Sequence, residues 1–372
     1  FISIVAFSIN NFRKEIKLNN NLLFIFIAIF LGSINSTKGI SSDLGYYHNI
    51  YVNVPNFNFI EYVFEYASES AREPLFSIIN YISYYLFFGS WNLFILFLSA
   101  FIYYLNFLAL NELLSNRRNY VIVSAVIFLA FFTQYFSLTS QIIRQLLASS
   151  ILFYVIAKNI RNGRINYILL ISSIFIHSSV LLFVPLIFFK NLYKPIKFNS
   201  FLTTSLLLIL FPLVLVLLTP FLSELFSFSS SISYVFDYEE KFTGSDGVSL
   251  NPNAIYFIAI PLITSILLNY FDEKSKDLMF IFNVFILLLI FVLTTSFTSP
   301  LVSYRYFFYT YNFIPFIFPI ILYNNNYFCF ITNICISLFM IYRFISTFES
   351  IVWDYANIYE ILFYPLIYLI YN

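Results

Sequence analysis

Charged residues are scarce in this chain. Lys and Arg number 19 and Asp and Glu number 18 among 372 residues, which is 10% in all, whereas soluble domains carry about 25%. Hydrophobic residues make up 60%, and the mean hydropathy is +0.84. This composition excludes a soluble globular protein and indicates one embedded in a lipid bilayer. The near balance of basic and acidic residues also argues against a nucleic-acid partner, which requires a basic patch.

Cysteine and histidine are also few, with two of each. Cys329 and Cys335 lie six residues apart in one apolar segment, so they point to different helix faces and do not form a disulfide or a metal pair. No cysteine or carboxylate is spaced near His177 as a metal ligand, which argues against a zinc site. We therefore expect no metal and no cofactor.

Apolar segments near the ~20 residues needed to cross a bilayer recur along the whole chain. They predict an all-α fold, a polytopic transmembrane helix bundle of about 10–13 membrane helices that include short or re-entrant ones. No length remains for a soluble catalytic domain, so we expect residues 1–372 to form a single integral membrane domain. The predicted spans lie at about 21–36, 91–112, 119–136, 141–157, 165–189, 200–222, 254–271, 278–297, 305–323 and 326–343.

Two segments do not fit single crossings. Residues 165–189 are flanked by basic loops on both sides, and ~25 residues of helix measure about 37 Å, too short for two full crossings. They predict a tight hairpin of two short helices with His177 near its tip. The segment Leu75–Phe88 cannot cross once without upsetting the parity of its neighbours, so we expect it to be re-entrant or interfacial.

Most of the basic residues cluster in short loops, which the positive-inside rule assigns to the cytoplasm. Residues 37–73 and the large loop 223–253 are then external. Six cations depart from this bias and fall outside or in the outer leaflet, and four of the six are arginines. These are Lys38, Arg72, Arg144, Lys241, Arg305 and Arg343.

Arg144 is the most informative of these cations, because ionisable groups inside apolar segments are expensive and usually face a bundle interior or a cavity. Polar and small residues recur around it at spacings of three and four, which predicts one stripe on a helix that lines a cavity, although Ser and Gln alone could join neighbouring helices. The stripe consists of Ser137, Ser140, Gln141, Arg144, Gln145, Ala148 and Ser149. Guanidinium groups match phosphate oxygens bidentately, so several external arginines suit a diphosphate.

External carboxylates supply candidate bases. Glu61, Glu65, Glu69 and Glu73 are spaced by four, which predicts the acidic edge of an interfacial amphipathic helix. Glu73 differs from the others because it stands between Arg72 and Pro74, where the chain turns back into the membrane, and it could act as a general base. Asp43 is a second candidate, and His177 could either transfer protons or simply be hydrogen-bonded structure.

Several sequence elements, in this order, resemble the EpsG-type branch of the Wzy-like bacterial polysaccharide polymerases. The matching elements are Lys38-Gly-Ile-Ser-Ser-Asp43 followed by Tyr46 and Tyr47, Arg72-Glu-Pro-Leu-Phe76, Ser140-Gln-Ile-Ile-Arg-Gln-Leu-Leu-Ala148, Ile176-His-Ser-Ser-Val-Leu-Leu-Phe-Val-Pro-Leu186 and Tyr304-Arg-Tyr-Phe-Phe308. The resemblance runs from about residue 20 to 345.

The resemblance implies an integral glycosyltransferase of the GT-C type. We expect it to be metal-independent, because Arg144 and Arg305 could stabilise the leaving diphosphate without a metal. It would join polyprenyl-diphosphate-linked oligosaccharide repeat units on the outer face of the bacterial cytoplasmic membrane, for an O-antigen, a capsule or an exopolysaccharide. A chain-length regulator protein is a further partner that the family allows. The candidate catalytic residues are Glu73, Asp43, Arg144 and His177, and the candidate diphosphate-binding residues are Arg72, Arg144, Gln145 and Arg305.

Two other functions stay open. A flippase or transporter of lipid-linked oligosaccharides would have cations in a central cavity open to both sides and internal repeats, and no repeat is visible here. A ligase, or another transferase of lipid-linked sugars, shares the chemistry and differs only in its acceptor.

Overall fold

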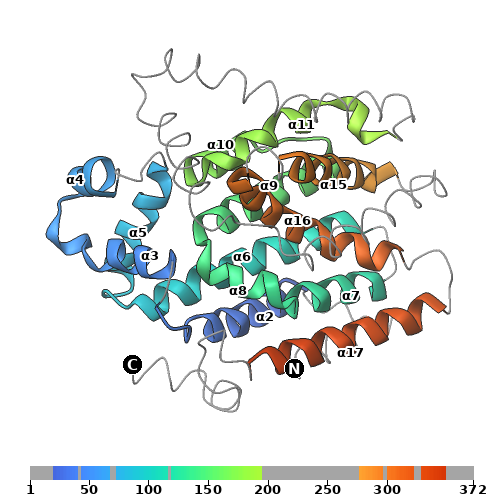
Figure 1. The fold of residues 1–372 in the computed structure, drawn as a ribbon, viewed down its shortest axis with the longest axis horizontal. Coiled ribbons are helices and arrows are strands. Elements are labelled where there is room, and N and C mark those ends of the chain that lie inside the picture. The colour runs from blue at the N-terminus through green and yellow to red at the C-terminus, as the bar shows by residue number, and fades with distance from the viewer. Residues whose placement is uncertain are drawn as a thin grey trace. The chain divides into compact units, whose positions relative to one another are not determined.

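The structure is a computed structural model that describes residues 20–40, 43–67, 73–115, 119–194, 276–295, 300–321 and 328–348. Every regular element in these ranges is helical, which agrees with the predicted all-α fold (Figure 1). The spans predicted at 200–222 and 254–271 and the loop 223–253 lie outside the described residues. The prediction of a single membrane domain stays a prediction.

The longer helices are α2 (Asn20–Asn35), α3 (Asp43–Val52), α5 (Pro74–Leu86), α6 (Trp91–Leu114), α7 (Asn119–Ala130), α8 (Thr133–Gln141), α9 (Ile143–Asn162), α10 (Tyr167–Ile176), α15 (Lys276–Thr295), α16 (Pro300–Ile321) and α17 (Phe328–Phe348). The short elements are the single turns at Val54–Asn56, Ser178–Leu182 and Lys190–Tyr193, α4 (Phe59–Glu61) with its π-helical continuation Tyr62–Tyr66, and α11 (Val184–Phe188). Helices therefore occur at the predicted spans wherever the chain is described.

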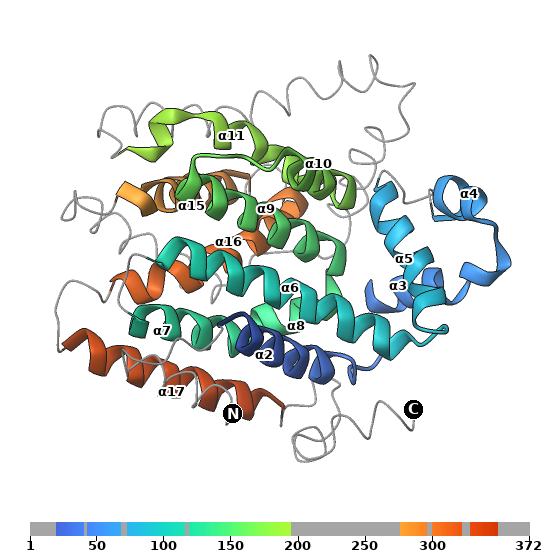
Figure 2. The ribbon, with the colours of Figure 1, turned by 180° about the vertical axis from the view of Figure 1, so that it is seen from behind.

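Contacts divide the chain into two units, Phe1–Val184 with Phe318–Asn372, and Pro185–Ile317. In the first unit α6 packs against α2 on one side and α9 on the other (Figures 1 and 2). Gly32 of α2 makes this approach possible, because an added Cβ would lie 2.5 Å from the Leu96 carbonyl oxygen of α6. Small residues allow the same close packing in membrane helix pairs generally. Glycine at this position thus fixes the spacing of α2 and α6.

A buried hydrogen-bond network joins α6, α8 and α9. The Asn106 amide donates to the Tyr135 hydroxyl at 2.8 Å and to the Ser150 hydroxyl at 2.6 Å. In an apolar core each such group must find a partner within the protein. The network therefore fixes the mutual register of the three helices that lead to Arg144.

Two described helices, α6 and α9, are each long and apolar enough to cross a membrane. A third span is possible if Ile122–Ala130 and Thr133–Gln141 form one, although they are bent by 55°. The span predicted at 119–136 falls on this bent pair, in which the chain breaks at Phe131 and Phe132 and continues as α8. Shorter apolar helices, α2, α10, α15 and α17 among them, also fit a membrane protein.

The polar stripe around Arg144 is not on one helix, contrary to the prediction. Ile142 has φ −104° and ψ 53°, which ends α8 and begins α9. Hydroxyl groups of α8 donate to carbonyls three residues earlier, as Thr139 does to Phe136 and Ser140 does to Ser137. Such bonds compete with regular helix geometry and help satisfy carbonyls near the end of α8. The break therefore places Arg144 in the first turn of α9.

In the second unit, the described residues of α15 pack against the turn Lys190–Tyr193. The Asn283 amide of α15 donates to the carbonyls of Leu192 and Lys194, at 2.7 Å and 3.0 Å.

In the first unit, α3, α4 and α5 gather at one end (Figures 1 and 2). That end contains the candidate site.

Candidate active site

Three helix termini bring the candidate residues together. Glu73 immediately precedes Pro74, which occupies the first turn of α5. Proline disfavours helical geometry at the residue before it, and Glu73, with φ −131° and ψ 60°, lies just before the first turn of α5. Arg144 lies in the first turn of α9, and His177 ends α10. Side chains at helix ends can converge on one point, as they do here.

The Glu73 carboxylate is at the centre of the cluster. Its Oε2 atom lies 2.9 Å from Nη1 of Arg144, and its Oε1 atom accepts a hydrogen bond from the Ser178 backbone N–H at 3.2 Å. Nδ1 of His177 lies 3.6 Å from Oε1. The predicted ion pair between Glu73 and an arginine is present, and His177 adjoins the same carboxylate. Helices that are far apart in the sequence therefore share one charged cluster.

Two aromatic rings hold the guanidinium of Arg144. Its Nε atom donates to the Tyr47 hydroxyl at 3.2 Å, and its Cζ atom lies 5.2 Å and 5.9 Å from the ring centroids of Tyr47 and Phe76. Stacked cations of this kind are stabilised by the ring faces. Burial raises the pKa of the Tyr47 phenol, while the nearby Arg144 lowers it in part. Tyr47 therefore acts as a neutral partner that fixes the direction of the guanidinium.

The imidazole of His177 is held by the serine that follows it by two positions. Nδ1 lies 2.7 Å from the Ser179 hydroxyl and accepts from the Ser179 backbone N–H at 3.2 Å. The side chain thereby caps the turn Ser178–Leu182. The helical break predicted at His177 is present, whereas the predicted fold-back of two short helices stays a prediction.

The other predicted site residues have different positions. Asp43 is exposed at the first position of α3, one turn before Tyr47. Gln145 is buried next to Arg144 and does not line the cavity described below. Arg72 lies outside the described residues. Arg305 falls within α16, and its side chain lies outside the described part of the chain.

The predicted acidic edge is only partly helical. Phe59–Glu61 begins as an α-helix and continues as a π-helical turn, so the spacing of four does not keep one face. Glu61 and Glu65 are exposed there, and Glu69 lies outside the described residues. Glu73 is buried and belongs to the charged cluster instead.

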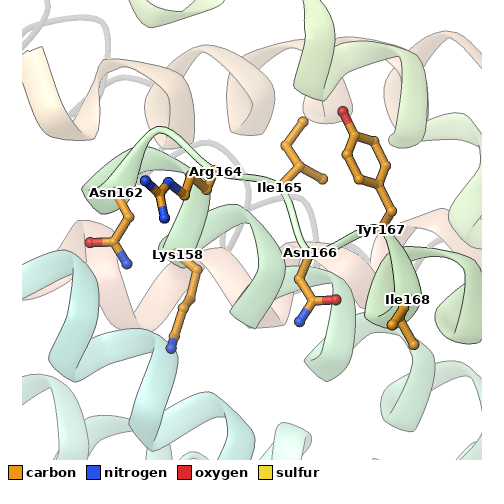
Figure 3. Close-up of a pocket in the computed structure, with 7 residues that line it drawn as sticks. All are labelled: Lys158, Asn162, Arg164, Ile165, Asn166, Tyr167 and Ile168. Atoms are coloured by element: carbon orange, nitrogen blue, oxygen red, sulfur yellow. The ribbon is translucent and has the colours of Figure 1, made fainter.

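A small cavity adjoins the cluster. It has a volume of about 10 Å³ and is lined by Tyr47, Ile50, Ala67, Glu73, Phe76, Ser77, Asn80 and Arg144. A much larger hollow of about 750 Å³ lies at the other end of α9, where Lys158 and Arg164 take part in its lining (Figure 3). The 14 positions between residues 144 and 158 correspond to about 21 Å of helix. The two spaces are therefore separate, and only the small one contacts the Glu73 cluster.

The sequence did not identify three residues that contribute to the site: Tyr47, Ser179 and Asn80. Tyr47 and Ser179 stand inside the elements that carry the family resemblance, which could have drawn attention to them. Asn80 is a polar residue in the apolar segment Leu75–Phe88, and that contrast was an available signal.

Among the described residues, no group of three or more His, Cys, Asp and Glu could hold a metal ion.

The sequence was compared with protein families, curated proteins and solved structures. A model of the EpsG family matches residues 20–370. No curated protein and no solved structure matches the chain. Since the match covers almost the whole sequence, this protein belongs to the EpsG family.

Proposed function

We propose that the protein polymerises oligosaccharide repeat units, transferring a glycan from a polyprenyl diphosphate to a second lipid-linked glycan on the outer face of the bacterial cytoplasmic membrane. Membership in the EpsG family supports a function of the polysaccharide-polymerase type in general. The observation that carries the specific proposal is the Glu73–Arg144–His177 cluster. It combines a phosphate-binding group with a proton acceptor at one point.

Arg144 suits the leaving diphosphate. Nε and Nη1 are oriented by Tyr47 and Glu73, which leaves Nη2 for a substrate oxygen. The first turn of a helix also favours anions, because its N–H groups carry partial positive charge. A donor that is already in position stabilises negative charge as it develops, without reorganisation. We propose that the guanidinium contacts the diphosphate as the bond to the sugar carbon breaks.

His177 suits the proton transfer better than Glu73 does. The Glu73 carboxylate already binds Arg144 and the Ser178 N–H, and both contacts favour its charged form and weaken it as a base. In the tautomer with a proton on Nδ1, His177 donates to the Ser179 hydroxyl in place of accepting from the Ser179 backbone N–H, and Nε2 is then the basic nitrogen. Glu73 lies close enough to stabilise the imidazolium that forms.

The proposed reaction transfers the donor glycan to the acceptor hydroxyl. The acceptor hydroxyl oxygen bonds to the anomeric carbon of the donor glycan, and its proton passes to Nε2 of His177. The bond from that carbon to the diphosphate oxygen breaks, and the lipid diphosphate leaves as an anion beside Arg144. Arg72 and Arg305 stay proposed diphosphate contacts on sequence grounds alone, as Asp43 stays a proposed alternative base.

Deletion of the gene tests the function. We expect single lipid-linked repeat units to accumulate at the cell surface and polymer to be absent, because transport would continue without polymerisation. Repeat units should be detected by surface labelling of extracted lipids. Repeat units confined to the cytoplasmic side would instead indicate a flippase. Long polymer left on the lipid carrier would indicate a ligase.

Replacing His177 with glutamine tests the proposed proton acceptor. We expect polymerisation to slow by about 10²–10⁴-fold, the usual contribution of a general base, and the acidic limb of the pH–rate profile to disappear. The measurement is the initial rate of polymerisation across the neutral pH range. His48→Gln is the matched control, because His48 packs edge-to-face on Trp91 and is not part of the cluster. A His177→Gln variant that keeps the wild-type pH profile would rule out this role.

A further inference from the structure

The side-chain amide of Asn80 has an unusual environment. Asn80 is only 2% exposed and lines the small cavity beside Glu73 and Arg144. Its Oδ1 atom is buried and has no hydrogen-bond partner within the described part of the chain. A buried acceptor without a donor is destabilising, so such atoms are rare in proteins. The position therefore calls for a further hydrogen-bond donor.

Tyr62 determines which end of the amide faces the cavity. The Tyr62 hydroxyl donates its single proton to the Ile50 carbonyl at 3.2 Å. It can therefore only accept from Asn80, with which it also forms a hydrogen bond. The amide nitrogen of Asn80 must face Tyr62, and Oδ1 is left for the cavity.

The size and lining of the cavity restrict its occupant. A volume of about 10 Å³ admits one group of the size of water or a hydroxyl. The occupant must donate a hydrogen bond to Oδ1 of Asn80. It also meets the Glu73 carboxylate and the Arg144 guanidinium, which line the same space. A sugar hydroxyl satisfies these conditions, as does a water molecule in the absence of substrate.

We propose that Asn80 binds a hydroxyl group of the lipid-linked glycan and thereby positions the sugar against the Glu73–Arg144–His177 cluster. This inference rests on the proposed function. The hydroxyl enters the cavity, replaces the water and donates to Oδ1. Hydroxyls on adjacent ring carbons lie side by side, so a neighbouring hydroxyl is then directed towards the charged cluster. Asn80 is a positioning and specificity residue in this scheme, and it takes no part in bond making.

Replacing Asn80 with leucine tests the proposal, because leucine has a similar size and no acceptor. The probe is the lipid-linked repeat unit isolated from a strain that lacks this chain, added to purified protein in micelles. We expect the dissociation constant to rise roughly tenfold to hundredfold, because the sugar hydroxyl is left unpaired. Binding is measured directly and does not require turnover. Asn80→Ala, which is smaller and cannot clash, is the second variant if the leucine variant fails to fold.

Ser83→Ala is the matched control. Ser83 is a buried polar residue of the same helix that does not line the cavity, and its replacement should leave binding unchanged. Wild-type protein that binds repeat units without joining them would contradict the proposed function and leave the role of Asn80 intact. Asn80→Leu that binds as tightly as wild type, with lowered thermal stability, would show a structural water only and overturn the inference. Absence of binding by the wild type would overturn both.

Discussion

Arg144→Lys is expected to lower the polymerisation rate by about 10²–10³-fold, the loss that follows removal of one well-placed donor at a developing anion. Lysine keeps the positive charge and loses the planar fork that binds phosphate oxygens bidentately. It also cannot donate to Tyr47 and pair with Glu73 in the geometry that orients the guanidinium. The rate should be measured with purified protein and lipid-linked repeat units, at matched abundance in the membrane.

Arg161→Lys provides a control on the same helix. Arg161 lies in the last turn of α9, is 46% exposed at its side chain and pairs with Glu112 near the surface. Its replacement should leave polymer formation close to wild type. Full-length polymer from Arg144→Lys would mean that charge alone matters at this position, and the bidentate phosphate contact would be wrong.

Glu73→Gln is expected to reduce both activity and stability. The side chains of Glu73 and Arg144 are 9% and 21% exposed, so removing the carboxylate leaves a mostly buried guanidinium without its counter-charge. Breaking a fully buried pair costs about 3–5 kcal/mol. The partial exposure of Arg144 lowers our expectation to about 1–3 kcal/mol. Activity should fall at least about 100-fold, because the orientation of Arg144 and the stabilisation of His177 are lost together.

Thermal unfolding in micelles measures the stability change, and Glu112→Gln is the comparison. The Glu112–Arg161 pair is more exposed, so its loss should cost less than about 1 kcal/mol. Glu73→Gln combined with Arg144→Gln should be less destabilising than the sum of the single changes, because the two residues interact directly. Additive effects would contradict a direct interaction between the two side chains.

The variants Glu73→Gln and His177→Gln together separate the roles of the two proposed bases. If Glu73 were the proton acceptor, Glu73→Gln would abolish the acidic limb of the pH–rate profile and His177→Gln would preserve it. The hydrogen bond from Ser178 and the ion pair with Arg144 favour the opposite result. On sequence alone Glu73 ranks before His177, because the sequence does not show that the Glu73 carboxylate already binds Arg144 and the Ser178 N–H.

The sequence by itself determined the helical membrane architecture. Length and polarity of apolar segments predict α2, α6, α15 and α17, because a bilayer requires about 20 apolar residues whose backbone groups are bonded within the segment. The short segment Leu75–Phe88 was likewise predictable, and α5 has 13 residues there. Arg144 and Glu73 were identifiable because charge in an apolar setting is locally visible.

Only the tertiary structure decided how these residues meet. The break at Ile142 depends on side-chain hydroxyls and packing, and a stripe read at regular helical spacing cannot reveal it. Tyr47, Glu73, Arg144 and His177 converge through contacts across 97 and 105 positions of sequence, as the hydrogen bonds Arg144–Tyr47 and Ser178–Glu73 illustrate. The unpartnered acceptor of Asn80 is likewise defined only by what surrounds it. Hydropathy is a property of each segment, whereas a site is a property of how segments pack, and long-range packing leaves no local pattern in the sequence.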